Sequence, residues 1–103
     1  MLNSYIVYYM RPEVFRDFCF GGSTPTVADL HKTHKRVRAF IACNLENVFH
    51  RMQAEIWSPN GEARQKIDEL GLSHTSMSVG DVVYDRREEK YFVVASVGFK
   101  EIN

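Results

Sequence analysis

One segment of the chain, residues 74–85, fixes where helical structure ends and sheet structure resumes. It follows Gly71 and Leu72, a pair typical of a helix that ends in a left-handed residue with an apolar contact. It runs into residues 82–84, whose β-branched and aromatic side chains are typical of a strand. The chain must therefore combine helices and strands in one fold, which excludes the all-helical and all-strand classes.

The chain has 103 residues, 45% of them hydrophobic, which is typical of one domain that buries roughly two thirds of its unfolded surface. We therefore expect a single domain over residues 1–103. Thirteen basic residues balance thirteen acidic residues, so no global field favours a nucleic acid or a membrane. The sequence has neither a signal peptide pattern nor an apolar run long enough to span a bilayer, so we expect a cytoplasmic protein without a membrane partner.

The residues that most often hold metals do not form a convincing set. Cys19 and Cys43 lie in apolar surroundings, and we expect both to be reduced and buried, because cytosolic thiols usually stay reduced. Two other pairs have close spacing, namely His31 with His34 and Glu46 with His50. Neither pair has a third ligand, and the chain has no glycine-rich phosphate loop, so we expect no metal and no cofactor.

The N-terminal part predicts a strand and two short helices. Residues 5–10 carry apolar or aromatic side chains on both faces, which favours a central strand. Pro12 is suited to the first turn of a short helix that ends at the glycine pair 21–22. Thr26 and Asp29 then have the spacing of a capping box, which predicts a single helical turn.

From Thr33 the apolar period changes to two, which predicts a second strand with two different faces. The expected apolar face consists of Val37, Ala39, Ile41 and Cys43. The expected basic face consists of His34, Arg36 and Arg38, extended by Lys32 and Lys35. Such a face suits phosphates or an acidic protein surface, and it equally suits a solvated strand whose charges discourage aggregation.

The middle of the chain predicts two helices. The first is capped by Asn44, ends at Trp57 and has the apolar stripe Leu45, Val48, Phe49, Met52 and Ile56. A turn at residues 58–61 follows, in which Ser58 or Asn60 can cap the next helix. The second helix has the apolar stripe Ala63, Ile67 and Leu70 and stops at Gly71.

The C-terminal part predicts a hairpin in which residues 82–84 and 91–99 are joined by the charged link 85–90. The expected fold is a single small α+β domain of order β-α-β-α-α-β-β. Its sheet is about four-stranded and mostly antiparallel, and the helices pack on one side of it.

Four residues within 74–85 have the side chains of a nucleophilic triad, namely His74, Ser76, Ser78 and Asp81. Triad members usually come from separated elements whose rigid positions set the geometry. The alternative is that the hydroxyls bond the backbone of their own loop, that Gly80 supplies a positive φ and that Asp81 caps the turn into the strand.

A binding surface is the other hypothesis. The basic strand face with His34, Arg36 and Arg38 is one candidate, and tyrosines of the first strand can add stacking if they share that face. Trp57, beside a tight turn, is a second candidate. The alternative for Trp57 is an indole that covers the core between two helices.

Two runs of the chain resemble a known group of proteins. Residues 52–64, MQAEIWSPNGEAR, and residues 71–83, GLSHTSMSVGDVV, are together similar to small proteins encoded on bacterial plasmids, phages and other mobile elements. The SMSVGD segment also resembles a strand-entry motif in large multidomain proteins of mobile elements. The similar runs cover about the C-terminal half. The resemblance implies a setting in mobile bacterial DNA and supplies no catalytic residues.

These observations favour a non-enzymatic accessory or regulatory protein of a bacterial mobile element that binds a protein or nucleic-acid partner. The alternative is a small hydrolase or nuclease that uses His74 with Ser76, Ser78 or Asp81. A homodimer formed through an exposed strand edge is a third possibility.

Overall fold

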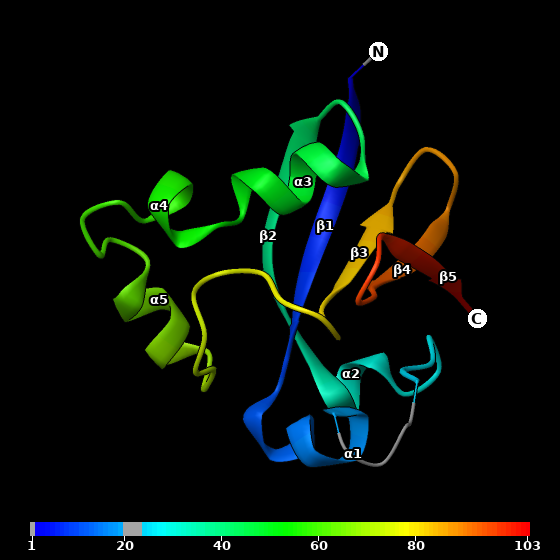
Figure 1. Ribbon diagram of the computed structural model, residues 1–103, viewed down its shortest axis with the longest axis horizontal. Helices are drawn as coiled ribbons and strands as arrows, with labels where there is room; N and C mark the ends of the chain where they lie inside the picture. Colours follow the sequence, from blue (N-terminus) through cyan, green and yellow to red (C-terminus); the bar gives the residue numbers. More distant parts are fainter. Residues whose placement is uncertain (1, 20–23) are drawn as a thin grey trace.

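The computed structural model describes residues 2–19 and 24–103, and its centre is a sheet of antiparallel strands (Figure 1). The sheet has five strands in the order β2-β1-β3-β4-β5. The strands are β1 (Asn3–Met10), β2 (His34–Ala42), β3 (Val82–Asp85), β4 (Lys90–Val94) and β5 (Phe99–Ile102). The single α+β domain is thus confirmed, with one strand more than the sequence predicts. The first strand, β1, is internal to the sheet, as expected.

The helices are all short. They are the 3-10 turn η1 (Pro12–Val14), α1 (Phe15–Cys19), α2 (Leu30–Thr33), α3 (Leu45–Arg51), α4 (Ala54–Trp57) and α5 (Arg64–Glu69). The predicted exit at the glycine pair 21–22 lies outside the described residues. The Thr26 hydroxyl accepts from the Asp29 backbone N–H at 3.3 Å, and α2 begins directly after Asp29, so the predicted turn is present.

The two faces of the sheet are covered differently. The helix-covered face carries Tyr5, Val7 and Tyr9, which form one core cluster with residues of α3, with Ile67 of α5 and with the segment that follows α5. The opposite face carries Val82, Val93 and Ile102, which pack on Leu30 at the start of α2. Helices therefore contact both faces, and the expectation that all of them pack on one side is wrong. The cause is Leu30, whose apolar side chain closes part of the second face.

The fifth strand arises from a turn inside the predicted strand 91–99. The Ala95 N–H donates to the Gly98 carbonyl oxygen at 2.9 Å, and Gly98 has φ +70°. Because the apolar alternation continues through this turn, the sequence pattern does not mark it. The chain reverses there, and β5 pairs with β4.

The predicted long helix 45–57 is interrupted between α3 and α4. Gln53 has extended backbone angles, φ −76° and ψ 141°. The segment after α5 supplies other partners for the freed backbone groups, since the Met77 N–H donates to the Met52 carbonyl and the Ser76 hydroxyl accepts from the Ala54 N–H. One continuous helix is therefore wrong, because a distant loop bonds to the backbone at this point.

The predicted helix ends are correct where they depend on local chemistry. The Asn44 side chain accepts from the Asn47 N–H at 2.8 Å and caps α3. Gly71 has φ +73°, and the Leu72 N–H returns to the Ile67 carbonyl, which closes α5 with a left-handed cap. Ser58 accepts from the Ala63 N–H at 2.9 Å, so it is the residue that caps the following turn.

Candidate functional site

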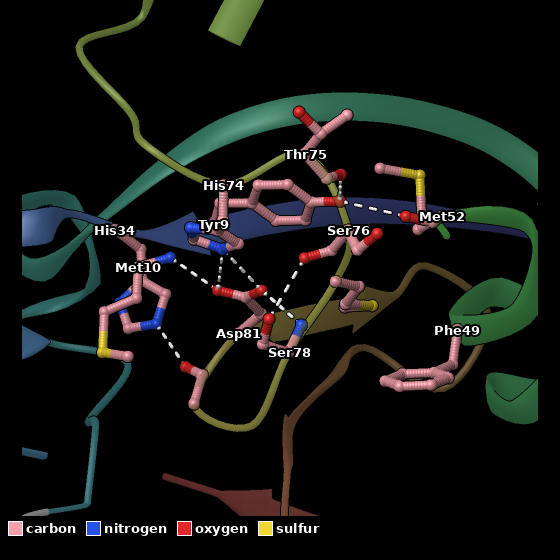
Figure 2. A network of polar contacts seen from close by, with 12 residues as sticks. Tyr9, Met10, His34, Phe49, Met52, His74, Thr75, Ser76, Ser78 and Asp81 are labelled. Carbon is pink, nitrogen blue, oxygen red and sulfur yellow. Dashed lines mark hydrogen bonds and ion pairs between the residues drawn. The ribbon is translucent and has the colours of Figure 1, made fainter. Parts of the chain in front are cut away.

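The segment 74–81 is organised around the buried carboxylate of Asp81 (Figure 2). This carboxylate has 0% exposure and accepts from the backbone N–H groups of Met10, at 2.7 Å, and Ser78, at 2.8 Å. Nε2 of His74 lies 2.9 Å from its second oxygen. The carboxylate therefore joins the end of β1 to the loop that leads into β3.

The His74 ring is packed between aromatic side chains. Its centroid lies 4.5 Å from that of Tyr9, with the rings nearly parallel, and 5.6 Å from that of Phe15. Nδ1 of His74 is buried and has no hydrogen-bond partner among the described residues. The ring also borders a small cavity of about 210 Å³, which is lined by Met10, Phe15, His74, Ser78, Val79 and Asp81.

The structure brings His74 and Asp81 together but leaves the candidate hydroxyls in backbone contacts (Figure 2). The Ser76 hydroxyl accepts from the Ala54 N–H at 2.9 Å, and the Ser78 hydroxyl donates to the Ser76 carbonyl at 3.1 Å. Within the described part of the chain, no hydrogen bond joins either hydroxyl to His74. A nucleophilic triad needs that bond, so the arrangement favours a structural role for these hydroxyls.

His34 is an internal residue of the same region. Only 1% of it is exposed, and its Nε2 lies 2.7 Å from the carbonyl oxygen of Gly80, whose φ is +98°. Burial lowers the pKa of His34 below its ordinary value, and the nearby Gly80 carbonyl opposes this shift. His34 is thus a buried residue that supports the loop through the Gly80 carbonyl.

A β-bulge separates the basic residues of β2. Val7 pairs with Arg38 and the next residue, Tyr8, pairs with Arg36, so Val37 is an extra residue without a partner. The bulge reverses the alternation of side chains along the strand. Arg36 consequently lies on the face of Tyr8, and Arg38 lies on the helix-covered face. The prediction that His34, Arg36 and Arg38 share one face is wrong.

The same bulge changes the expected apolar face of β2. Val37 is buried, but Ala39 is exposed and Ile41 is 56% exposed. Cys43 is a free and exposed cysteine, so its predicted burial is also wrong, whereas the side chain of Cys19 lies outside the described residues. The residues after the bulge simply point in the opposite direction from the one that a regular strand predicts.

Trp57, the last residue of α4, is half-buried against the segment after α5. Its indole N–H donates to the Thr75 carbonyl at 3.0 Å, and the Arg38 guanidinium lies 5.3 Å from the centre of the indole. The alternative of an indole that covers the core therefore describes its position. The residue is partly exposed.

Three half-buried tyrosines lie together on the side of the sheet opposite the helix-covered face, and we call them the tyrosine face. They are Tyr8 of β1, Tyr84 of β3 and Tyr91 of β4. The Tyr84 and Tyr91 ring centroids are 4.4 Å apart, and those of Tyr8 and Tyr91 are 6.3 Å apart. Burial, followed by the neighbouring Tyr91, raises the pKa of Tyr8, so its phenol stays neutral at physiological pH.

A cavity of about 490 Å³ adjoins the tyrosine face. None of the described residues that line it carries a carboxylate. Nε of Arg11, one of the lining residues, is buried and has no hydrogen-bond partner among the described residues. The lining consists of Tyr8, Arg11, Val27, Leu30, His31, His34, Lys35, Arg36 and Tyr91. The cavity is therefore suited to an anionic group beside an aromatic surface.

The sequence pattern does not identify Arg11, Tyr84 and Tyr91 as residues of this surface. The alternation within β3 and β4 predicts that Tyr84 and Tyr91 each point to one side of the sheet. The alternation does not predict that Tyr84 and Tyr91 lie on the same side of the sheet, because that depends on the register between β3 and β4. Arg11 lies in a connection and carries no periodic signal.

Among residues 2–19 and 24–103, no group of three or more histidine, cysteine, aspartate or glutamate side chains is arranged to hold a metal ion. Every helix in this part of the chain is too short or too polar to cross a membrane.

The chain was also compared with known proteins. Comparisons with protein-family models, with curated proteins and with solved structures found no match.

Proposed function

We propose that this protein is a non-enzymatic binding module of a bacterial mobile element and that it binds single-stranded nucleic acid on the tyrosine face. The observation that carries the proposal is the pairing of three clustered tyrosines with a cationic cavity at their edge. The mobile-element setting rests on the resemblance of residues 52–64 and 71–83. The proposal includes a cytoplasmic location, where such nucleic acids occur.

The tyrosines support the proposed stacking of nucleic-acid bases. Bases of a single strand are free to stack on side-chain rings, whereas paired bases are not. Tyr84 and Tyr91 are cross-strand partners, so the sheet itself holds their rings in place. A surface that is rigid before binding loses little entropy when the ligand arrives.

The cavity supports the proposed binding of the phosphate groups. Arg11, Lys35 and Arg36 are basic residues that line the cavity, and an anion within reach of the buried Arg11 Nε would supply its missing acceptor. The chain has no net charge, so this local concentration of cations stands out against the rest of the surface. A protein partner would instead need acidic side chains at the same place.

The hydrolase or nuclease alternative, which uses His74 with Ser76, Ser78 or Asp81, receives less support. The His74–Asp81 contact resembles two members of a triad. Both serine hydroxyls contact backbone groups, and among the described residues neither hydroxyl has a hydrogen bond to His74.

The test measures the binding of a labelled single-stranded oligonucleotide of about ten nucleotides by fluorescence anisotropy. We expect binding that weakens steeply as salt increases, because phosphate contacts release counterions. Replacing Tyr84 with alanine should cost about 1–3 kcal/mol of binding free energy through lost stacking. Tyr84→Phe keeps the ring and should bind nearly as well as the wild type.

Charge is tested separately. Arg36→Gln should weaken binding and lower the salt dependence, whereas Lys66→Gln, which removes an exposed cation of α5, should change neither. Binding that is insensitive to salt, or equal in Tyr84→Ala and wild type, would contradict the proposal. Binding of an acidic protein but of no nucleic acid would favour the protein-partner hypothesis instead.

A further inference from the structure

A second group of cations and aromatic rings lies on the helix-covered face of β2. The guanidinium groups of Arg38 and Arg51 lie 4.8 and 4.6 Å from the centre of the Phe40 ring. Arg38 also lies over Trp57. Two cations from different elements, β2 and α3, thus share one aromatic neighbour.

No carboxylate of the described residues forms an ion pair with Arg38 or Arg51. Arg38 donates weakly to the Met52 sulfur, and Arg51 donates to the Ile41 carbonyl, which are neutral acceptors. Burial, followed by the charge of Arg51, lowers the pKa of Arg38. Two like charges therefore contact the same ring, the Arg38 guanidinium is partly desolvated, and no described carboxylate pairs with either group.

An anion that contacts both guanidinium groups would offset their repulsion and accept hydrogen bonds from their N–H groups. Guanidinium groups bind phosphate and carboxylate oxygens through paired N–H donors. We infer that Arg38 and Arg51, with Phe40 and Trp57 beside them, form a second anion site that takes a phosphate group.

The position of this site indicates where the phosphate comes from, and this step rests on the proposed function. β2 is an edge strand, and its residues 34–42 include no acidic residue. The bulge at Val37 puts Arg36 on the tyrosine face and Arg38 on the other. A strand that stacks on the tyrosines and passes over the free edge of β2 would meet Arg36 first, and Arg38 with Arg51 next.

The experiment uses Trp57, the only tryptophan of the chain, as the reporter. Wild-type protein is titrated with tripolyphosphate and, separately, with the single-stranded oligonucleotide, while indole emission is recorded. We expect both ligands to change the emission. Arg51→Gln should abolish the response to tripolyphosphate and should lower the slope of log affinity against log salt for the oligonucleotide by about 0.7.

Controls separate this site from the tyrosine face. Arg51→Lys keeps the charge and should retain a reduced response, and Lys66→Gln should behave as wild type. Thermal melting of each variant verifies that it is folded. Oligonucleotide binding that leaves Trp57 emission unchanged, with an unaltered salt slope in Arg51→Gln, would overturn the second site and leave the proposed function standing.

The opposite pattern is equally informative. A tripolyphosphate response that depends on Arg51, without any oligonucleotide binding, would support the anion site and overturn strand binding. The absence of a Trp57 response to either ligand would overturn the inference.

Discussion

Gly80 is the single residue whose conformation most constrains the segment 74–81. Its φ of +98° lies in a region that β-branched residues almost never adopt. A Cβ at this position would lie 2.7 Å from Cε of Met10, so that flexible side chain would have to move as well. We therefore expect Gly80→Val to lower the free energy of unfolding by about 1–3 kcal/mol, measured by urea denaturation.

Gly61 offers a matched control for this substitution. It also has a positive φ, +81°, but a Cβ there would contact nothing within 4 Å. Gly61→Val should lower the free energy of unfolding through backbone strain alone and by less than Gly80→Val. An unchanged denaturation midpoint for Gly80→Val would contradict the role assigned to this glycine.

At the level of residues, the sequence predicts what short-range chemistry decides. The positive φ of Gly80 and the capping role of Asp81 follow from the loop itself, and both are correct. The position of Arg38 could not be predicted in this way. A bulge is a mismatch between two strands, and β2 alone contains no glycine or proline that marks it.

At the level of elements, Ser76 decides where α4 begins. Its hydroxyl accepts from the Ala54 N–H, one of the N-terminal donors that a short helix cannot satisfy internally. Ser76→Ala should lower the free energy of unfolding by about 1 kcal/mol, measured by chemical denaturation.

Ser78→Ala is a useful comparison, because that hydroxyl is exposed and donates only to the Ser76 carbonyl. Its effect on the free energy of unfolding should be smaller. If Ser76→Ala removed a hydrolytic activity without any change in stability, the hydrolase alternative would be favoured over this structural role.

The elements also mark the limit of sequence patterns. Helix and strand types were predicted correctly wherever a periodic stretch lay between turn residues, as in α5 and β1. The interruption at Gln53 was missed because its causes, Ser76 and Met77, lie far along the chain. The turn before β5 was missed because the apolar alternation continues through it, although Gly98 there has a positive φ.

At the level of the whole molecule, the candidate surface forms only when separate segments of the chain come together in the fold. The tyrosine face combines residues from β1, β3 and β4, and its cavity adds Arg11 and α2. No sequence window contains this set. The sequence predicts His34, Arg36 and Arg38 on one basic face. Of these three residues, only Arg36 is exposed on the tyrosine face.

The stability of the assembled molecule should depend on pH through His34, which lies where β2 meets the segment 74–81. Burial lowers its pKa below the ordinary value of 6.5 that it regains on unfolding. Below that value the unfolded chain binds more protons than the folded protein, so the free energy of unfolding decreases as the pH falls. The stabilisation is fully present above pH 6.5.

Thermal melting should therefore give a lower Tm at about pH 5.5 than at about pH 7.5. His34→Gln retains a polar side chain that can reach the Gly80 carbonyl but does not titrate, so the Tm of this variant should depend less on pH. His50→Gln removes an exposed histidine and should keep the wild-type dependence. If the Tm of His34→Gln fell on acidification by as much as the Tm of the wild type, protonation of His34 would not cause the pH dependence. The contact between β2 and Gly80 would then be insensitive to the charge of His34.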